Sequence, residues 1–393
     1  MPLADDDPKK WIYKEHTEVK HEILRKYLEA WIKILGRYHN TVCFFDCFAG
    51  RGLYTNGELG SPLIIMRAVK DVIRKFDFLK HVELTFIEKN KNNHENLVKV
   101  IQDELNQDSS GYSGITIKNI INDEFADIAD TIVQDCSHPS FYFIDPFGFS
   151  GIPFDSIKKI LALPRTEVFI NFMIEYVYRF LPSEGHARSI EELYGIPNVK
   201  ALTEEEYEYL DLEAALLKIY RDQLHQGANV KFTFPFKVNS DGKLRTTYYL
   251  IHATNNFKGC EVMKNVMYNA GTKKQFGYLG PAEGQMAIGN FDNLESLQEY
   301  LADIFNGQSL TYEAVRMQTA NDLPYVTGDY KTALLQLESK SKISIEGKGK
   351  RGGMSDSCMV HFTPVTIEDA AEEVKPLEVE DMEEHSQSSL FDF

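Results

Sequence analysis

Four acidic side chains come directly after stretches of sequence that resemble β-strands: Asp46, Glu88, Asp123 and Asp145. The first of these stretches, residues 42–45, is apolar without alternation, as expected of a parallel strand that is buried on both faces. The carboxyl ends of parallel strands share one edge of a sheet, and ligands bind outside that edge. We therefore expect the four carboxylates to surround one ligand. Glu88, after the second strand, has the position of an acid that binds a ribose.

The first of these strands runs into a glycine turn. Residues 42–54 read V-C-F-F-D-C-F-A-G-R-G-L-Y, and Gly50 and Gly52 suit positive φ angles and the close approach of a ligand. A G-x-G pair recurs by chance in a chain with 25 glycines, and the third glycine of the dinucleotide-binding pattern is missing. The position of the pair between a buried strand and a helix still favours a nucleotide-binding turn.

Five strand-like runs alternate with helical stretches, which predicts an α/β fold with a mostly parallel sheet. The runs lie at residues 42–45, 82–87, 115–121, 141–144 and 167–172. The helix before the first run is expected to start at Thr17 as its cap and to end near Gly36. Helical sequence at about 174–226 is expected as an insertion. Two further runs, 231–238 and 244–253, predict a closing hairpin.

Taken together, these features resemble class I S-adenosylmethionine-dependent methyltransferases, and residues of roughly 14–360 resemble more closely the three-Cys-motif partner (TcmP) proteins. The segments that carry the resemblance are Asp46-Cys-Phe-Ala-Gly-Arg-Gly, Gly60-Ser-Pro-Leu, Phe86-Ile-Glu-Lys, Phe143-Ile-Asp-Pro-Phe-Gly, Val168-Phe-Ile-Asn-Phe and Tyr249-Leu-Ile-His-Ala-Thr-Asn. The resemblance implies a Rossmann-like sheet of seven strands whose last hairpin is antiparallel, followed by a C-terminal winged helix-turn-helix. It also implies S-adenosylmethionine as the cofactor and requires no metal.

The same resemblance implies roles for the residues of the turn and the strand ends. Gly50 and Gly52 would lie against the methionine part of the cofactor, and Asp46 would bind its amino group directly or through water. Glu88 would accept hydrogen bonds from the ribose hydroxyls, and Asp123 would reach the adenine amino group. The residues by themselves leave another interpretation open, in which Asp46 and Asp123 cap helices and Glu88 is a surface acid.

The candidate catalytic residues are Asp145, Pro146 and Phe147, in the sequence Asp-Pro-Phe-Gly. This motif resembles the D/N-P-P-Y/F motif of amino-methyltransferases, but it has only one proline and its aromatic residue comes one place early. The alternative is a tight turn that needs proline and glycine. A nucleic-acid base would have to be extruded from a duplex to reach such a pocket. Three residues either close over the cofactor or belong to a solvated face: Lys20, His16 and Arg51.

The sequence therefore leads to a methyltransferase that acts on nucleic acid as the first functional hypothesis. The alternative is a non-catalytic, methyltransferase-like binding protein that works with a partner, such as a three-Cys-motif protein, in defence or DNA repair. A hydride-transferring dehydrogenase is disfavoured, because the third glycine is missing and the sheet closes with a hairpin.

The pattern changes after Gly289 to three short helices and two strands. The helices are expected at about 294–305, 311–319 and 329–340, and the strands at 343–345 and 359–362. This order is that of a winged helix-turn-helix, in which Lys348, Lys350 and Arg351 would contact DNA phosphates as a wing. Acidic residues outnumber basic ones here, so a winged helix that binds protein is an equal alternative.

Charge and composition complete the expected domain organisation. The net charge of −17 argues against a surface that coats nucleic acid as a whole. We expect a methyltransferase-like domain at 1–290, a winged helix at 291–363 and an acidic, disordered tail at 364–393. The last residues, Gln387 to Phe393, resemble peptides that bind sliding clamps. The chain has no membrane-length apolar run or signal peptide, which predicts a cytoplasmic protein, and its five cysteines are expected as free thiols.

Overall fold

The computed structural model describes residues 13–76, 80–134, 137–239, 245–272, 275–279 and 294–364. These residues form two compact units. The first contains the described residues up to 279 together with Arg316–Tyr330, and the second contains those of 294–315 and 331–364. The expected tail from residue 365 on, with the peptide Gln387 to Phe393, lies outside the described residues. No described helix is long and apolar enough to cross a membrane.

The first unit is built on a mixed sheet of eight strands in the order β3-β2-β1-β4-β5-β7-β6-β8. The strands are β1 Thr41–Asp46, β2 His81–Ile87, β3 Ile115–Ile121, β4 Ser140–Ile144, β5 Thr166–Phe172, β6 Phe232–Asn239, β7 Thr246–Thr254 and β8 Gly277–Tyr278. Strand β7 alone runs against its neighbours, β5 and β6. The α/β fold class, the seven expected strands and the antiparallel hairpin are confirmed, and the short β8 is added beside β6.

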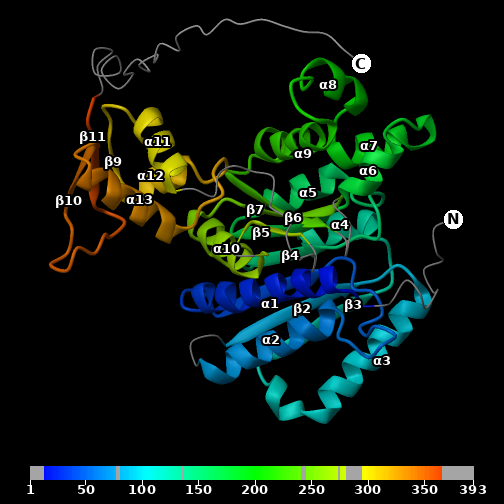
Figure 1. Cartoon of the computed structure of the whole chain (residues 1–393). Helices are drawn as coiled ribbons and strands as arrows, with labels where there is room; N and C mark the ends of the chain where they lie inside the picture. Colours follow the sequence, from blue (N-terminus) through cyan, green and yellow to red (C-terminus); the bar gives the residue numbers. More distant parts are fainter. Residues whose placement is uncertain are drawn as a thin grey trace, which may run out of the picture. The chain divides into compact units, whose positions relative to one another are not determined.

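Helices cover both faces of this sheet (Figure 1). One face packs against α1 Glu15–Leu35, α2 Ser61–Lys75, α3 Lys91–Gln107 and α10 Phe257–Ala270. The other packs against α4 Phe125–Gln134, α5 Phe154–Leu161, α6 Ile174–Phe180, α7 Ala187–Tyr194, α8 Val199–Glu205 and α9 Leu212–Asp222. Neighbouring residues of β1 show why the strands are continuously apolar, because Phe44 packs into the first core and Phe45 into the second.

The expected start of the first helix is wrong. Helix α1 begins at Glu15, with Lys14 in the extended capping position, and Thr17 is a buried residue of its first turn. The Thr17 amide donates to the Lys14 carbonyl, so the backbone is already helical where a cap was expected.

The second unit confirms the expected order of helices and strands. Helices α11 Leu294–Ile304, α12 Tyr312–Gln318 and α13 Thr327–Ser339 precede β10 Ile343–Glu346 and β11 Met359–Phe362. A strand that we did not expect, β9 Ser309–Thr311, pairs with β11 and completes a three-stranded sheet. The rings of Phe305 and Phe362 lie 5.4 Å apart in the small core of this unit.

Candidate functional site

The glycine turn after β1 is held by the backbone. The Ala49 amide donates to the Ile87 carbonyl at 2.8 Å, and the Gly60 amide donates to the Gly52 carbonyl at 2.9 Å. Gly50 and Gly52 have φ angles of 63° and 81°, in the region that favours glycine. A Cβ at Gly52 would also come within 3.2 Å of Leu97 on α3. The second glycine is therefore required by helix packing as well as by the turn.

Two cavities adjoin this turn at the carboxyl edge of the sheet, and both are lined by Phe48 and Phe147. One, of about 20 Å³, is lined by Gly50, Gly52, Tyr54, Ser61 and Asp145 among others. The other, of about 90 Å³, is lined by Glu88, Asp123 and Pro146 among others. The structure thus gathers the candidate cofactor-binding and catalytic residues around one place. Asp46 is fully buried and lines neither cavity.

Asp46 ends β1 with no exposed surface. Its Oδ1 accepts a hydrogen bond from the Phe48 amide at 3.3 Å, whereas its buried Oδ2 has no hydrogen-bond partner within the described part of the chain. The pKa of Asp46 is raised to about 7, mainly by burial and also by the charges of Asp145 and Glu88, while hydrogen bonds from the Ser61 hydroxyl and the Phe48 amide oppose the rise. An incoming cation or hydrogen-bond donor would stabilise the ionised form.

Glu88 and Asp123 lie at the ends of neighbouring strands, β2 and β3. Glu88 is only 9% exposed, and its Oε1 accepts from the Asn90 amide at 2.7 Å. Asn122 donates to the Glu88 carbonyl at 2.8 Å, which ties the two strand ends together. Asp123 is exposed and accepts from the Glu124 amide at 2.8 Å. Both residues line the larger cavity.

Asp145 is already engaged by protein groups. Its Oδ2 forms an ion pair with Lys20 of α1, and its Oδ1 accepts from the Asn171 side chain of β5 at 2.6 Å. Lys20 is buried, so the alternative of a solvated face is wrong for this residue. The pairing favours a fixed carboxylate over one that is free to accept a target amino group. Phe147, two residues on, is 54% exposed and lines both cavities.

Several residues near the turn could not be identified from sequence patterns. His21 is 4% exposed, and its ring lies 6.1 Å from that of Tyr54, which lines the smaller cavity. Burial lowers the pKa of His21 well below its usual value, and the neighbouring Lys20 charge adds to this. Ser61 and Asn171 lie in segments that carry the family resemblance, but neither was assigned a role at the site. His16 and Arg51 are half-buried, and the Arg51 carbonyl accepts from Asn96 at 2.6 Å.

The wing of the second unit has two kinds of cation. Lys348 contacts the Glu338 carboxylate of α13 at 2.6 Å, so its charge is largely neutralised. Lys350 and Arg351 are exposed and form no ion pair with the described residues. Of the three expected phosphate contacts, these two are available to a ligand.

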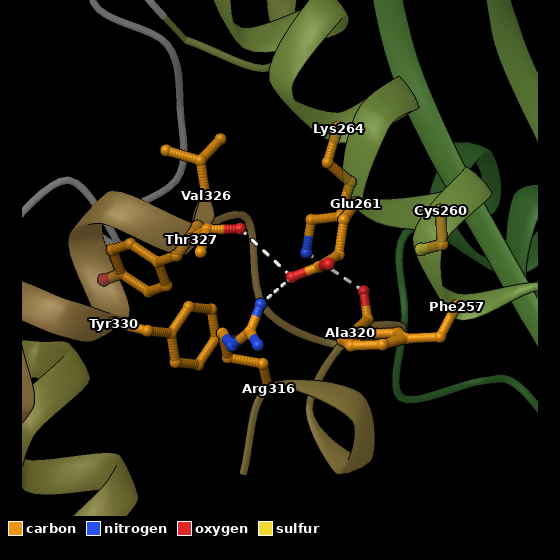
Figure 2. A pocket seen from close by; sticks show the side chains of 10 residues that line it. Phe257, Cys260, Glu261, Lys264, Arg316, Ala320, Val326, Thr327 and Tyr330 are labelled. Carbon is orange, nitrogen blue, oxygen red and sulfur yellow. Dashed lines mark hydrogen bonds and ion pairs between the residues drawn. The ribbon is translucent and has the colours of Figure 1, made fainter. Parts of the chain in front are cut away.

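A separate cluster of buried charge lies on α10, and Figure 2 shows it from close by. Glu261 forms an ion pair with Arg316 and accepts from the Thr327 hydroxyl at 3.1 Å. Lys264 donates to the carbonyls of Ala320 and Leu323 at 3.1 and 2.6 Å. Burial lowers the pKa of Lys264 to about 8. Because each charged group has protein partners, the cluster serves to fasten the segment Arg316–Tyr330 to α10.

Comparison with known proteins gives one family match and several solved structures. Residues 281–349 match the model of the GMT-like wHTH domain. No curated protein matches the chain. A Legionella pneumophila protein of known structure is 13% identical, with a TM-score of 0.37 over 66% of this chain and 94% of that one. The O-methyltransferase TomG of Streptomyces achromogenes, whose structure was solved with SAM, is 11% identical. Its TM-score is 0.33, and the match covers 64% of this chain and 99% of TomG.

Proposed function

We propose that this chain is an S-adenosylmethionine-dependent methyltransferase that acts on nucleic acid. The observation that carries the proposal is the pair of cavities that share Phe48 and Phe147 and bring the glycine turn together with Glu88, Asp123 and Asp145. A mostly parallel sheet that ends in an antiparallel hairpin, as the resemblance to class I methyltransferases implies, supports the proposal. A dehydrogenase remains disfavoured, because that sheet is closed by the hairpin of β6 and β7.

The residues at this edge fit the cofactor. The orphaned Asp46 oxygen suits a cationic amino group, directly or through a water molecule, and Glu88 and Asp123 suit ribose hydroxyls and an adenine amino group. When bound, the cofactor would supply an electrophilic methyl group on a sulfonium ion. The protein's part is to hold this group in line with the acceptor and to exclude water.

The acceptor is proposed to be a nucleic-acid base. The exposed ring of Phe147 at the mouth of the site offers a stacking surface for an extruded base. The match to the GMT-like wHTH domain supports a second unit that holds nucleic acid by its phosphates, as do the exposed cations Lys350 and Arg351, which form no ion pair with the described residues. In this arrangement the second unit positions the strand and the first unit transfers the methyl group.

Isothermal titration of the whole chain with S-adenosylmethionine tests the cofactor. We expect binding that weakens at least about tenfold in Asp46→Asn, as for loss of a hydrogen bond to a charged group. The matched control is Asp130→Asn, which removes an exposed carboxylate paired with Lys159. No heat at high protein concentration would contradict the proposal. Radiolabelled methyl transfer to single-stranded and duplex DNA and RNA then identifies the acceptor.

The engagement of Asp145 favours a second candidate, a binding protein that does not transfer methyl groups. If Lys20 and Asn171 keep both Asp145 oxygens occupied, the site would bind its cofactor without turnover. Such a protein would work with a partner, a three-Cys-motif protein or a sliding clamp held by residues 387–393. It predicts cofactor binding without methyl transfer, and a function that survives Asp145→Asn but not deletion of residues 295–363.

A further inference from the structure

The helix-turn-helix formed by α12 and α13 has a long connection between its two helices. In the order α11, β9, α12, α13, β10, β11, helix α13 has the place of the helix that reads bases in the major groove. A turn of about 3–4 residues joins the helices of such a motif, whereas residues 319–326 separate α12 from α13 here. Arg316–Tyr330 belongs to the first compact unit. The first turn of α13 and the rest of this helix are therefore parts of different units.

The connection is hydrogen-bonded to elements of the first unit. The Asn321 side chain donates to the Lys231 carbonyl at 2.8 Å and accepts from the Thr233 amide at 2.9 Å. The Asn321 carbonyl accepts from Arg221 of α9 at 2.7 Å. Lys264 of α10 holds two further carbonyls of the connection. These bonds fix the connection to α9, to α10 and to the start of β6.

The first turn of α13 is fixed in the same way, and Figure 2 shows its bond to α10. The Thr327 hydroxyl donates to the Glu261 carboxylate at 3.1 Å. Tyr330 is 2% exposed, and its hydroxyl oxygen lies 2.7 Å from Oγ1 of Thr319. The one charged residue of the turn is Asp329, an acid that a DNA phosphate would repel. The residues that contact base edges in a helix-turn-helix are thus engaged inside the chain.

The later polar residues near α13 hold the second unit together. Oε1 of Gln336 accepts from the Gln298 side chain of α11 at 2.6 Å. Lys340, just after α13, donates to Oε1 of Gln298 at 2.8 Å. Glutamine and lysine are residue types that pair with adenine and guanine edges, and here both are bonded to α11. Lys331 is the only cation within α13, and it is half-buried.

We propose that the second unit holds duplex nucleic acid by its phosphates without reading base sequence. Residues 319–330, which we call the docking segment, bind the first unit in place of a major groove. The phosphates meet Lys350 and Arg351 of the wing, which are exposed. The inference rests on the proposed function, because it assigns the choice of the methylated base to the first unit, where Phe147 lines the cavities.

Fluorescence anisotropy of the whole chain with labelled duplexes tests the phosphate contact. AT-rich, GC-rich and mixed duplexes of equal length should bind with affinities within about threefold of one another. The double variant Lys350→Gln, Arg351→Gln should weaken all of them by about tenfold or more at low salt. Gln336→Ala is the control, and it should leave the affinities unchanged.

Hydrogen exchange of the whole chain tests the docking segment itself. The amides of residues 319–330 should be protected in wild type, because the segment is bonded to the first unit. Their exchange should be at least about tenfold faster in Glu261→Gln, which weakens the contacts of Arg316 and Thr327. The matched control is Asp130→Asn, which removes an exposed carboxylate and should leave this exchange unchanged.

Three results would overturn the proposal. The first is a preferred duplex sequence whose advantage is lost in Gln336→Ala or Thr327→Val, because α13 would then read bases. The second is rapid exchange of residues 319–330 in wild type, which would leave the amino end of α13 open to a groove. The third is the absence of duplex binding.

The proposed function fails by a different measurement. Reading of bases by α13 would remove this inference while S-adenosylmethionine binding and methyl transfer remain. An absence of S-adenosylmethionine binding would remove the proposed function, whereas the duplex affinities and the exchange rates would be unchanged.

Discussion

Two of the places where the first unit buries charge differ in whether the protein completes the hydrogen bonds. On α10, Glu261 is met by Arg316 and Thr327, and Lys264 is met by two carbonyls. At the glycine turn, Asp46 keeps one buried oxygen without a partner in the described chain. A shifted pKa occurs in both places, so it does not by itself mark a binding site. The incomplete partner set is what distinguishes the turn.

The largest expected effect is on the α10 cluster. Glu261→Gln leaves the Arg316 charge buried, at 3% exposure, without its carboxylate. Removal of one partner of a buried ion pair costs about 3–5 kcal/mol of unfolding free energy. Urea unfolding followed by circular dichroism measures it. The double variant Glu261→Leu, Arg316→Met should recover much of the loss, and cofactor affinity per folded molecule should not change. A loss of cofactor affinity in Glu261→Gln would contradict this, because it would mean that Glu261 contributes to ligand binding.

The Asp46 substitution should have the opposite pattern, with little loss of stability and a large loss of binding. The folded-state pKa of about 7 lies above the ordinary value of an aspartate, so this group stabilises the fold at low pH and loses that contribution as pH rises through 7. Asp46→Asn should therefore be more stable than wild type above pH 7, by on the order of 1 kcal/mol per unit of pKa shift that is relieved.

Cofactor affinity gives the second measurement on the same variant. In wild type it should rise with pH until about 7 and then level off, because the ionised Asp46 is the form that binds the amino group. Titrations at several pH values should show no such rise in Asp46→Asn. A rise that persists in the variant would mean that another group titrates.

Lys264 should make the free energy of unfolding depend on pH in the opposite direction from Asp46, and the change should be smaller. Its folded-state pKa of about 8 lies below the ordinary 10.5 of a lysine, so the charged form is penalised in the fold. Stability should rise between pH 8 and 10, by at most about 1.4 kcal/mol per pH unit. Lys264→Met should flatten this slope in urea unfolding, and Lys99→Met, on the exposed face of α3, should keep it. Equal slopes in both variants would contradict the assignment.

The contrast between the two places also explains what the sequence could predict. The strands were found because they are apolar on both faces, so that Phe44 and Phe45 of one strand enter different cores. Strands β8 and β9 were missed because two or three residues show no periodicity. The gathering of Asp46, Glu88, Asp123 and Asp145 at one edge follows from parallel topology alone.

What the sequence could not predict is which of these acids has protein partners. Lys20 and Asp145 are separated by 125 positions in the chain, and Asn171 reaches Asp145 from another strand. The Thr17 cap failed for a related reason, because Thr17 is a buried residue in the first turn of a helix that packs against α2 and α10. Partner sets depend on side-chain packing between elements, and local patterns do not record that packing.

The same contrast between paired and unpaired charge recurs on the wing of the second unit, where the expected effect is smallest. Lys348 is neutralised by Glu338, whereas Lys350 and Arg351 have no partner in the described chain. If the wing contacts phosphates, the double variant Lys350→Gln, Arg351→Gln should lower the slope of log affinity against log salt by about 2 for duplex DNA. Lys348→Gln should lower it by less than about 1, since that charge is already compensated. Fluorescence anisotropy across a salt series measures both slopes.

An equal decrease of the slope in the two variants would show that Lys348 leaves Glu338 to bind DNA. An absence of DNA binding in wild type would instead favour a winged helix that binds protein.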